Sequence, residues 1–312
     1  MLNKTLKIRK IKNKKAMFFT LIAIAILFLF LVSYTFYSVV QDRKSVQKRI
    51  LTMNNFVYSL EQDMPRQLYT SGFRIIFLME NHILETGEYI TGFDAAFNEL
   101  FYNATLYEET DEQIESLMEE ATFSGIQENV NNKGGKINID VSLTEPEIFV
   151  SQDDPWNIKL NLTAKLLIED KADLALWNKT TNIVTYIPIQ NFEDPLYIVG
   201  TNGSVTNHIN QTPYDVPIPS DNLLNHVSNS YYIANTDAPS FLDRLQGNLE
   251  PDSNGIESLV HLPTLSAQGI PTKDKSCVDY IYFSSNNPLA STIAGMPSWF
   301  KLDEPHKTLY GV

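Results

Sequence analysis

The chain has 312 residues, 43% of them apolar, with 17 Phe, 15 Tyr and 3 Trp, which is enough to bury a hydrophobic core and excludes a disordered chain. Seven basic residues lie before residue 16, so the remaining 17 basic and 37 acidic residues give residues 16–312 a net charge of −20. A surface of that sign repels phosphate backbones, which argues against a nucleic-acid partner. The single cysteine, Cys277, excludes an intramolecular disulfide and a multi-cysteine zinc site.

The N-terminus predicts a membrane anchor. Residues 1–15 form a basic leader without acids, and residues 16–40 then run without a charge. As a helix this segment reaches about 37 Å, against roughly 30 Å of hydrocarbon, so we expect it to span the bilayer. A cleavable secretory signal has a shorter apolar region. Fewer basic residues follow the segment than precede it, which predicts a single-pass cell-membrane protein with a cytoplasmic N-terminus and an extracytoplasmic C-terminal part.

The helix is expected to continue beyond the membrane as an amphipathic stalk over residues 41–64, because no Gly or Pro occurs between Ala16 and Met64. Two interpretations of its apolar stripe stay open. The stripe packs on the protein's own globular part, or it pairs as a coiled coil with another copy or with a membrane or surface protein. The stripe consists of Val46, Ile50, Met53, Val57, Leu60 and Met64.

Pro65 predicts the end of the stalk, and residues 65–133 are expected to form a helical region. Its helices are expected to start at Ser71-Gly72, at Thr91 and at Thr110, where Gln113 three residues later suggests a capping box. The last helix is rich in glutamate. We interpret these acids as a solvated face rather than as a calcium or partner site.

After Gly134-Gly135 the hydrophobic period changes from helical to two, which predicts antiparallel strands with one buried face. The fold class is therefore α+β: a long N-terminal transmembrane and amphipathic helix, a short helical neck and an antiparallel β-rich ectodomain over residues 134–312. Asp279 is an acid inserted among apolar neighbours in the last of the expected strands. These strands cover residues 137–143, 156–166, 172–189, 256–262 and 277–283.

No motif predicts catalysis, a cofactor or a metal. The five histidines show no pair at i, i+3 or i+4, and His82 with Glu85 lacks a further ligand. Cys277 with His306 or His261 as base is an alternative, but a buried inert thiol is commoner in such an apolar setting. Pairs of acids that could serve a glycosidase are unavoidable in a chain with 37 of them. We therefore predict that the protein is not an enzyme.

Five N-x-Ser/Thr sequons lie in the part expected outside the membrane, where N-glycans are added. Their number is only slightly above chance. Asn161 is the strongest of them because alternation places it on the polar face of a strand. The five sites are Asn103, Asn161, Asn178, Asn202 and Asn210.

The order of a basic leader, Lys14-Lys15-Ala16, an apolar helix from Met17, an amphipathic continuation and a β-rich part resembles archaeal type IV pilin-like surface proteins with a class III signal peptide. The resemblance covers residues 10–64. It implies that a membrane peptidase cuts between Ala16 and Met17, and that the freed helix can bundle as the core of a filament. Family members carry Gln after the cut and a register-setting Glu at the fifth mature position, where this chain has Met17 and Leu21.

These observations predict a membrane-anchored surface protein with an acidic extracytoplasmic domain, pilin-like in layout, that has a structural or binding role. Two alternatives remain. An anchored hydrolase of envelope polymers would require a cleft with converging acids or a histidine. An accessory subunit of a membrane complex would be held through the stripe of the stalk.

Overall fold

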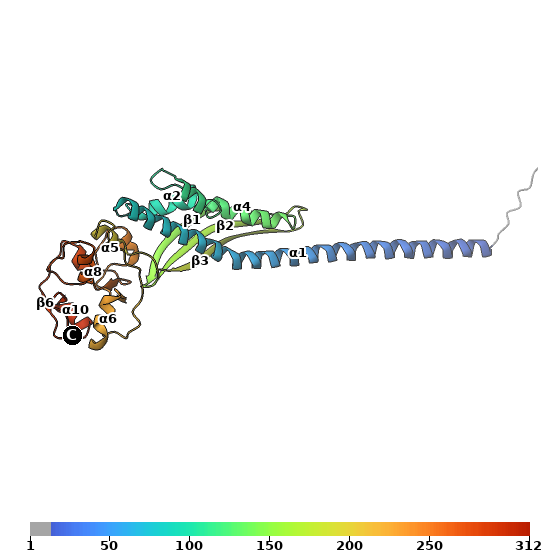
Figure 1. Ribbon diagram of the computed structural model, residues 1–312. Coiled ribbons are helices and arrows are strands. Elements are labelled where there is room, and N and C mark those ends of the chain that lie inside the picture. Colours follow the sequence, from blue (N-terminus) through green and yellow to red (C-terminus); the bar gives the residue numbers. More distant parts are fainter. Residues whose placement is uncertain (1–13) are drawn as a thin grey trace, which may run out of the picture.

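The computed structural model describes residues 14–312, so the basic leader up to residue 13 lies outside the described part. Helix α1 (Lys14–Thr86) has 73 residues and is about 110 Å long. Its N-terminal half projects as a bare rod, and its C-terminal half enters a head that holds the rest of the chain (Figure 1). The α+β class is confirmed: short helices and antiparallel sheets follow the long apolar helix.

The expected break at Pro65 is wrong, because α1 continues through this proline to Thr86. A proline inside a helix costs about 3 kcal/mol, since it removes a hydrogen bond and crowds the preceding turn. Fully burying one large apolar side chain contributes about 1.5–3 kcal/mol. Several residues of α1 beyond the proline are buried in the head, so tertiary packing outweighs the local cost. They are Leu68, Ile75, Ile76, Leu78, Met79 and Ile83.

The helix start expected at Ser71-Gly72 is also wrong, because both residues lie in the middle of α1. Gly72 serves instead for close approach to the sheet. A Cβ atom there would lie 2.1 Å from Leu160 Cδ1 and 2.7 Å from Ile187 Cδ1. Only glycine lets α1 pack this closely.

Three short helices follow α1 and pack beside it: α2 (Phe93–Asn103), α3 (Glu112–Met118) and α4 (Phe123–Gly135). The capping box expected at Thr110 is wrong, because the N-cap of α3 is Asp111, whose Oδ1 accepts the Ile114 N–H at 2.7 Å. Asp and Thr are both good N-caps, so the neighbouring residue competes for this role. The N-cap of α2 is Gly92, one residue after the expected Thr91.

A three-stranded antiparallel sheet in the order β1-β2-β3 is formed by β1 (Ile139–Asp154), β2 (Asn157–Asp170) and β3 (Leu176–Pro188). The even-numbered residues of β2 from Ile158 to Ile168 are all buried, as the alternation predicts. This inner face packs against α1 and α4, and the polar odd-numbered face of β2 points away from them. The sheet, α1, α2 and α4 share one hydrophobic core.

Residues 189–312 form a distal lobe, farthest from the rod (Figure 1), with a second hydrophobic core of its own. Long loops join its short elements, among them residues 213–219 and 251–255. The strand expected over 256–262 is shorter, and the strand expected over 277–283 is wrong because a helix forms there. The elements are α5 (Pro195–Gly200), α6 (Ser220–Ser228), β4 (Tyr232–Ala234), α7 (Phe241–Leu245), β5 (Ile256–Ser258), α8 (Leu262–Ala267), α9 (Asp279–Phe283), β6 (Ala290–Thr292), β7 (Lys301–Asp303) and α10 (Glu304–Leu309).

Candidate functional site

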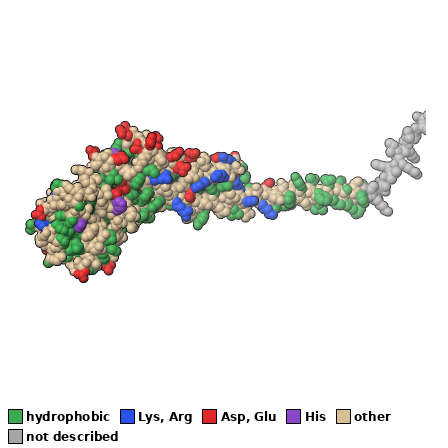
Figure 2. Space-filling view, viewed as in Figure 1, with side chains coloured by type: hydrophobic (Ala, Val, Ile, Leu, Met, Phe, Trp, Pro, Cys, Tyr) green, Lys and Arg blue, Asp and Glu red, His purple; other side chains and the backbone are tan. Residues whose placement is uncertain are grey.

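The bare half of α1 is the most conspicuous apolar surface of the described residues (Figure 2). Its most apolar 18-residue window has a mean hydropathy of 2.6, and none of that window is buried. Seventeen large apolar side chains between Met17 and Val40 are exposed. Removing one such side chain from water contributes about 1.5–3 kcal/mol. Summed over all of them, this free energy exceeds the typical free energy of unfolding of a domain, about 5–15 kcal/mol. By length and composition, α1 can cross a membrane once.

The predicted stripe divides where α1 enters the head. Val46 is half-buried and Ile50 is 45% exposed, whereas the next four stripe residues are at most 5% exposed. Those four pack in the core shared with the sheet and α2–α4. Only the first two positions are therefore open to a partner outside this chain. The buried four are Met53, Val57, Leu60 and Met64.

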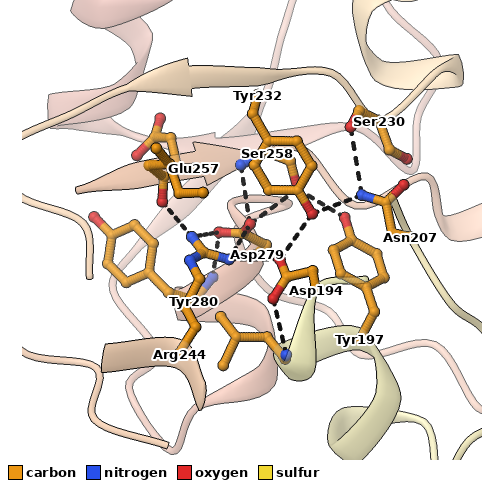
Figure 3. Close-up of polar contacts among 12 residues, drawn as sticks. Asp194, Tyr197, Asn207, Ser230, Tyr232, Arg244, Glu257, Ser258, Asp279 and Tyr280 are labelled. Carbon is orange, nitrogen blue, oxygen red and sulfur yellow. Dashed lines mark hydrogen bonds and ion pairs between the residues drawn. The ribbon is translucent and has the colours of Figure 1, made fainter. Parts of the chain in front are cut away.

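A buried polar network centred on Arg244 of α7 joins the elements of the distal lobe (Figure 3). Arg244 Nη1 donates to Asp194 Oδ2 at 2.6 Å and to Asp279 Oδ2 at 2.9 Å, and Nη2 donates to the Ile256 carbonyl oxygen. None of the three charged side chains is exposed. Burial lowers the pKa of Arg244, but the two carboxylates outweigh it and raise this pKa, so the guanidinium stays charged.

Each carboxylate of this network also fixes a piece of backbone. Asp194 is the N-cap of α5, because its Oδ1 accepts the Leu196 N–H at 2.9 Å. Asp279 Oδ2 accepts both the N–H and the hydroxyl of Ser258 at 2.9 Å. Asp279 Oδ1 accepts the Tyr280 N–H at 2.6 Å, and the acid inserted among apolar residues is the first residue of a helix rather than part of a strand.

Two buried tyrosines complete the network (Figure 3). The Tyr232 hydroxyl donates to Asp194 Oδ2 at 2.7 Å and accepts from Asn207 Nδ2 at 2.8 Å. The Tyr197 hydroxyl lies 2.9 Å from Ser258 Oγ. Burial raises the pKa of both phenols well above the usual value, so they remain neutral donors.

A second buried cluster surrounds His306 of α10. Its Nδ1 lies 2.6 Å from Asp303 Oδ2, and its Nε2 lies 3.2 Å from Glu257 Oε2 and 3.1 Å from the Tyr280 hydroxyl. Burial lowers the pKa of His306, but hydrogen bonds to the two carboxylates raise it to about 10. The imidazolium is therefore charged at neutral pH and bridges β5, β7 and α10.

These groups form buried polar clusters inside the distal lobe, in which Arg244 Nε and Glu257 Oε1 lack a hydrogen-bond partner. Every hydrogen bond of the Arg244 cluster is made within the lobe, and its charged atoms do not reach solvent. His306 is a charged donor between two acids, so it lacks the free lone pair that a general base needs. The sequence indicated only Asp279 in advance. The other side-chain partners in the Arg244 cluster are 12 to 61 residues apart in the chain, and local patterns do not reveal such pairs.

The geometry gives little support to the alternative in which Cys277 acts with His306 or His261 as its base. Cys277 is buried, and burial raises the pKa of its thiol to about 11. Its Sγ contacts the Trp299 carbonyl oxygen at 3.7 Å rather than a histidine. Such a thiol is not a thiolate at neutral pH.

Other histidines and acids make contacts at separate places in the structure. His82 lies on α1 beside Tyr107, and His208 pairs with Glu193 at 3.2 Å. Asp153 pairs with Lys159 at 2.5 Å on the sheet. Within residues 14–312 the structure brings together no group of three or more His, Cys, Asp or Glu that could hold a metal.

The expected cleavage position lies at the start of α1, where Met17 is 74% exposed. Among the sequon asparagines, Asn103, Asn178 and Asn202 are exposed and Asn210 is half-buried. Asn161 is half-buried, with a side-chain oxygen that is buried and lacks a hydrogen-bond partner. The three exposed positions are therefore more open to modification than Asn161.

Comparison with protein-family models, with curated proteins and with solved structures finds no match to this chain. What the structure shares with the pilin-like layout is a long apolar N-terminal helix followed by a domain that contains antiparallel sheets.

Proposed function

We propose that the chain is a non-enzymatic, single-pass membrane protein that holds an acidic extracytoplasmic head at a fixed distance from the bilayer, in a structural or binding role. The observation that carries this proposal is the continuity of α1. The same unbroken helix supplies the exposed apolar segment and, from Met53 on, part of the core of the head. A rigid helix without a flexible linker sets both the height and the orientation of the head.

The absence of charge between residues 16 and 40 and the seven basic residues before it support a cytoplasmic N-terminus. The sealed Arg244 and His306 clusters support a non-enzymatic role over the hydrolase alternative. In a pilin-like assembly, the exposed apolar rod would form the contacts between copies. In an accessory subunit, the two stripe positions that are not buried, Val46 and Ile50, would contact the partner.

The test is membrane fractionation of the full chain combined with labelling of intact cells. We expect the protein to stay in the membrane fraction after carbonate washing and to require detergent for release. Since Cys277 is buried, a Leu289→Cys variant places one accessible thiol on the head, where Leu289 is 94% exposed. An impermeant maleimide should label this variant, but not the parent, on intact cells.

A protein found in the soluble fraction without detergent would overturn the anchor, and labelling only after cell lysis would overturn the orientation. N-terminal sequencing of the membrane form then separates two roles. A start at Met1 indicates a fixed anchor, and a start at Met17 indicates a processed, pilin-like subunit.

A further inference from the structure

The turn between β2 and β3, residues 171–175, lies beside the part of α1 that leaves the uncharged segment. Ala172 and Leu174 line a cavity of about 400 Å³ together with Ser45 and Lys48 of α1. Ser45 lies five residues, about 7–8 Å along the helix axis, beyond Val40. The head-group layer extends roughly 5–8 Å beyond the hydrocarbon on each side. Arg49 and Thr52 line the same cavity, so the turn lies alongside residues 45–52 of α1, about 7–18 Å beyond Val40, and its near end is at the outer edge of the head-group layer if the hydrocarbon ends at Val40.

Arg49 of α1 holds this turn against the rod. Its Nε donates to Asp170 Oδ1 at 2.5 Å, and its Nη2 donates to the Asn138 carbonyl oxygen at 2.6 Å. Asp170 is 1% exposed, and its other oxygen accepts the Leu174 N–H at 3.3 Å. Because α1 and the turn are joined by these contacts, tilting of the rod carries the turn with it.

The end of the sheet nearest the rod carries three large apolar side chains in contact with solvent. Leu174 is 44% exposed, Leu176 is 62% exposed and Trp177 is 37% exposed. Tryptophan favours the membrane interface, where its ring is buried among head groups while its N–H stays hydrated. We propose that this tip, residues 171–177, inserts into the head-group layer of the bilayer that α1 spans, as a second membrane contact of the head.

The charged side chains around the tip also match the head-group layer of a bilayer. Lys48, Lys136 and Lys171 are exposed at this end of the head, where basic side chains gather although the molecule is acidic (Figure 2). Asp173 is exposed in the same turn, and Lys171 also pairs with Asp140 at 3.0 Å. Both signs are present, so the tip matches zwitterionic head groups without requiring an anionic lipid. Lysine side chains can extend to lipid phosphates while their stems cover apolar surface.

This inference rests on the proposed anchoring, and its test is designed to separate the two. Full-length protein with Cys277→Ser is reconstituted into phosphatidylcholine vesicles that carry a spin-labelled head group. A fluorophore is attached to Leu176→Cys or, as the matched control, to Leu289→Cys at the far end of the head. Both leucines are exposed, so neither substitution opens the core.

We expect the spin-labelled lipid to quench the fluorophore at position 176 at least threefold more than the fluorophore at position 289. Equal quenching at the two positions, in protein that floats with the vesicles, would overturn the tip contact and leave the anchor standing. Self-quenching between labelled copies without quenching by lipid would assign the tip to a contact between copies, which also overturns the proposal. Protein that fails to float would overturn the anchor and the tip contact together.

Discussion

The guanidinium of Arg244 donates to the Asp194 carboxylate at 2.6 Å, and neither side chain has any solvent exposure. The pair connects α7 to the start of α5 across 50 residues of sequence. Asp279 also pairs with this guanidinium, so one buried cation is shared by two carboxylates. The distal lobe has few long helices or strands, and this network joins its loops in their place.

Replacing Arg244 with Met is expected to destabilise the distal lobe by about 3–5 kcal/mol, because two carboxylates would remain buried without a cation. Urea unfolding of the full chain in detergent, followed by near-ultraviolet circular dichroism, measures the loss. Arg66→Met serves as the control, since Arg66 is not part of the network. Equal midpoints for the two variants would contradict the structural role of the pair.

Replacing Gly72 with Ala is expected to destabilise the head by about 1–3 kcal/mol, because the added Cβ would overlap the Leu160 side chain. Gly135→Ala is the matched control: it is also helical, and nothing lies within 4 Å of its added Cβ. That change should be neutral or stabilising by up to about 1 kcal/mol. Urea unfolding measures the change in the free energy of unfolding for both variants. A Gly72→Ala variant as stable as the parent would argue against the close packing of α1 on the sheet.

Introducing a charge at Met53 distinguishes the two interpretations of the stripe. Met53 is 1% exposed, so Met53→Glu should unfold part of the head at a cost of several kcal/mol. Leu51→Glu, at a position 55% exposed on the same helix, should leave the thermal midpoint nearly unchanged. If Met53→Glu kept the head folded and only released a bound partner, the stripe would be an intermolecular contact.

Glu80 makes the stability of the head depend on pH. It is 3% exposed, its Oε1 lacks a hydrogen-bond partner, and burial followed by the nearby Glu193 carboxylate raises its pKa well above the usual value. An acid with a raised folded pKa destabilises the fold increasingly as pH rises above its unfolded pKa of about 4.5. Glu80→Gln should therefore be more stable than the parent at pH 7, by about 1–2 kcal/mol, and equal to it near pH 4.

Unfolding midpoints at these two pH values test this expectation. Glu85→Gln, at an exposed position one turn further along α1, is the control and should behave like the parent at both. A Glu80 variant that is less stable than the parent at pH 7 would show that the carboxylate is ionised and stabilising.

His306 should give the opposite pH dependence. Its folded pKa of about 10 exceeds the unfolded value of 6.5, so its contribution is complete below pH 6.5 and is lost as pH rises toward 10. His306→Gln should lose about 2–3 kcal/mol at pH 6, where the charged hydrogen bonds are intact. Its difference from the parent should shrink by pH 10. The exposed His208→Gln is the control, and a difference that does not change with pH would exclude a charged His306.

The sequence predicted those elements whose signal is local and periodic. The strict alternation of β2 follows from one face of the sheet being buried, and Ile158 to Ile168 lie inside as expected. The helix end predicted at Pro65 and the helix start predicted at Gly72 were wrong for the same reason. Both are helix breakers by local propensity, and both lie in a helix whose buried face outweighs that propensity.

The distal lobe was harder to predict because its elements are short. A run of apolar residues such as 277–283 fits a buried strand or a helix equally well. In the structure this run contains the helix α9, and its first residue, Asp279, has a carboxylate that binds Arg244 and the backbone of Ser258. Neither partner is adjacent in sequence.

The sequence by itself determined the uncharged N-terminal segment, its basic flank and the alternating strands, because each is a property of consecutive residues. Tertiary structure alone decided that α1 runs unbroken from that segment into the core of the head, and that the buried Arg244 joins the loops of the distal lobe. Both outcomes arise from burial against residues remote in the chain, and the free energy of such contacts exceeds the local preferences that a sequence displays.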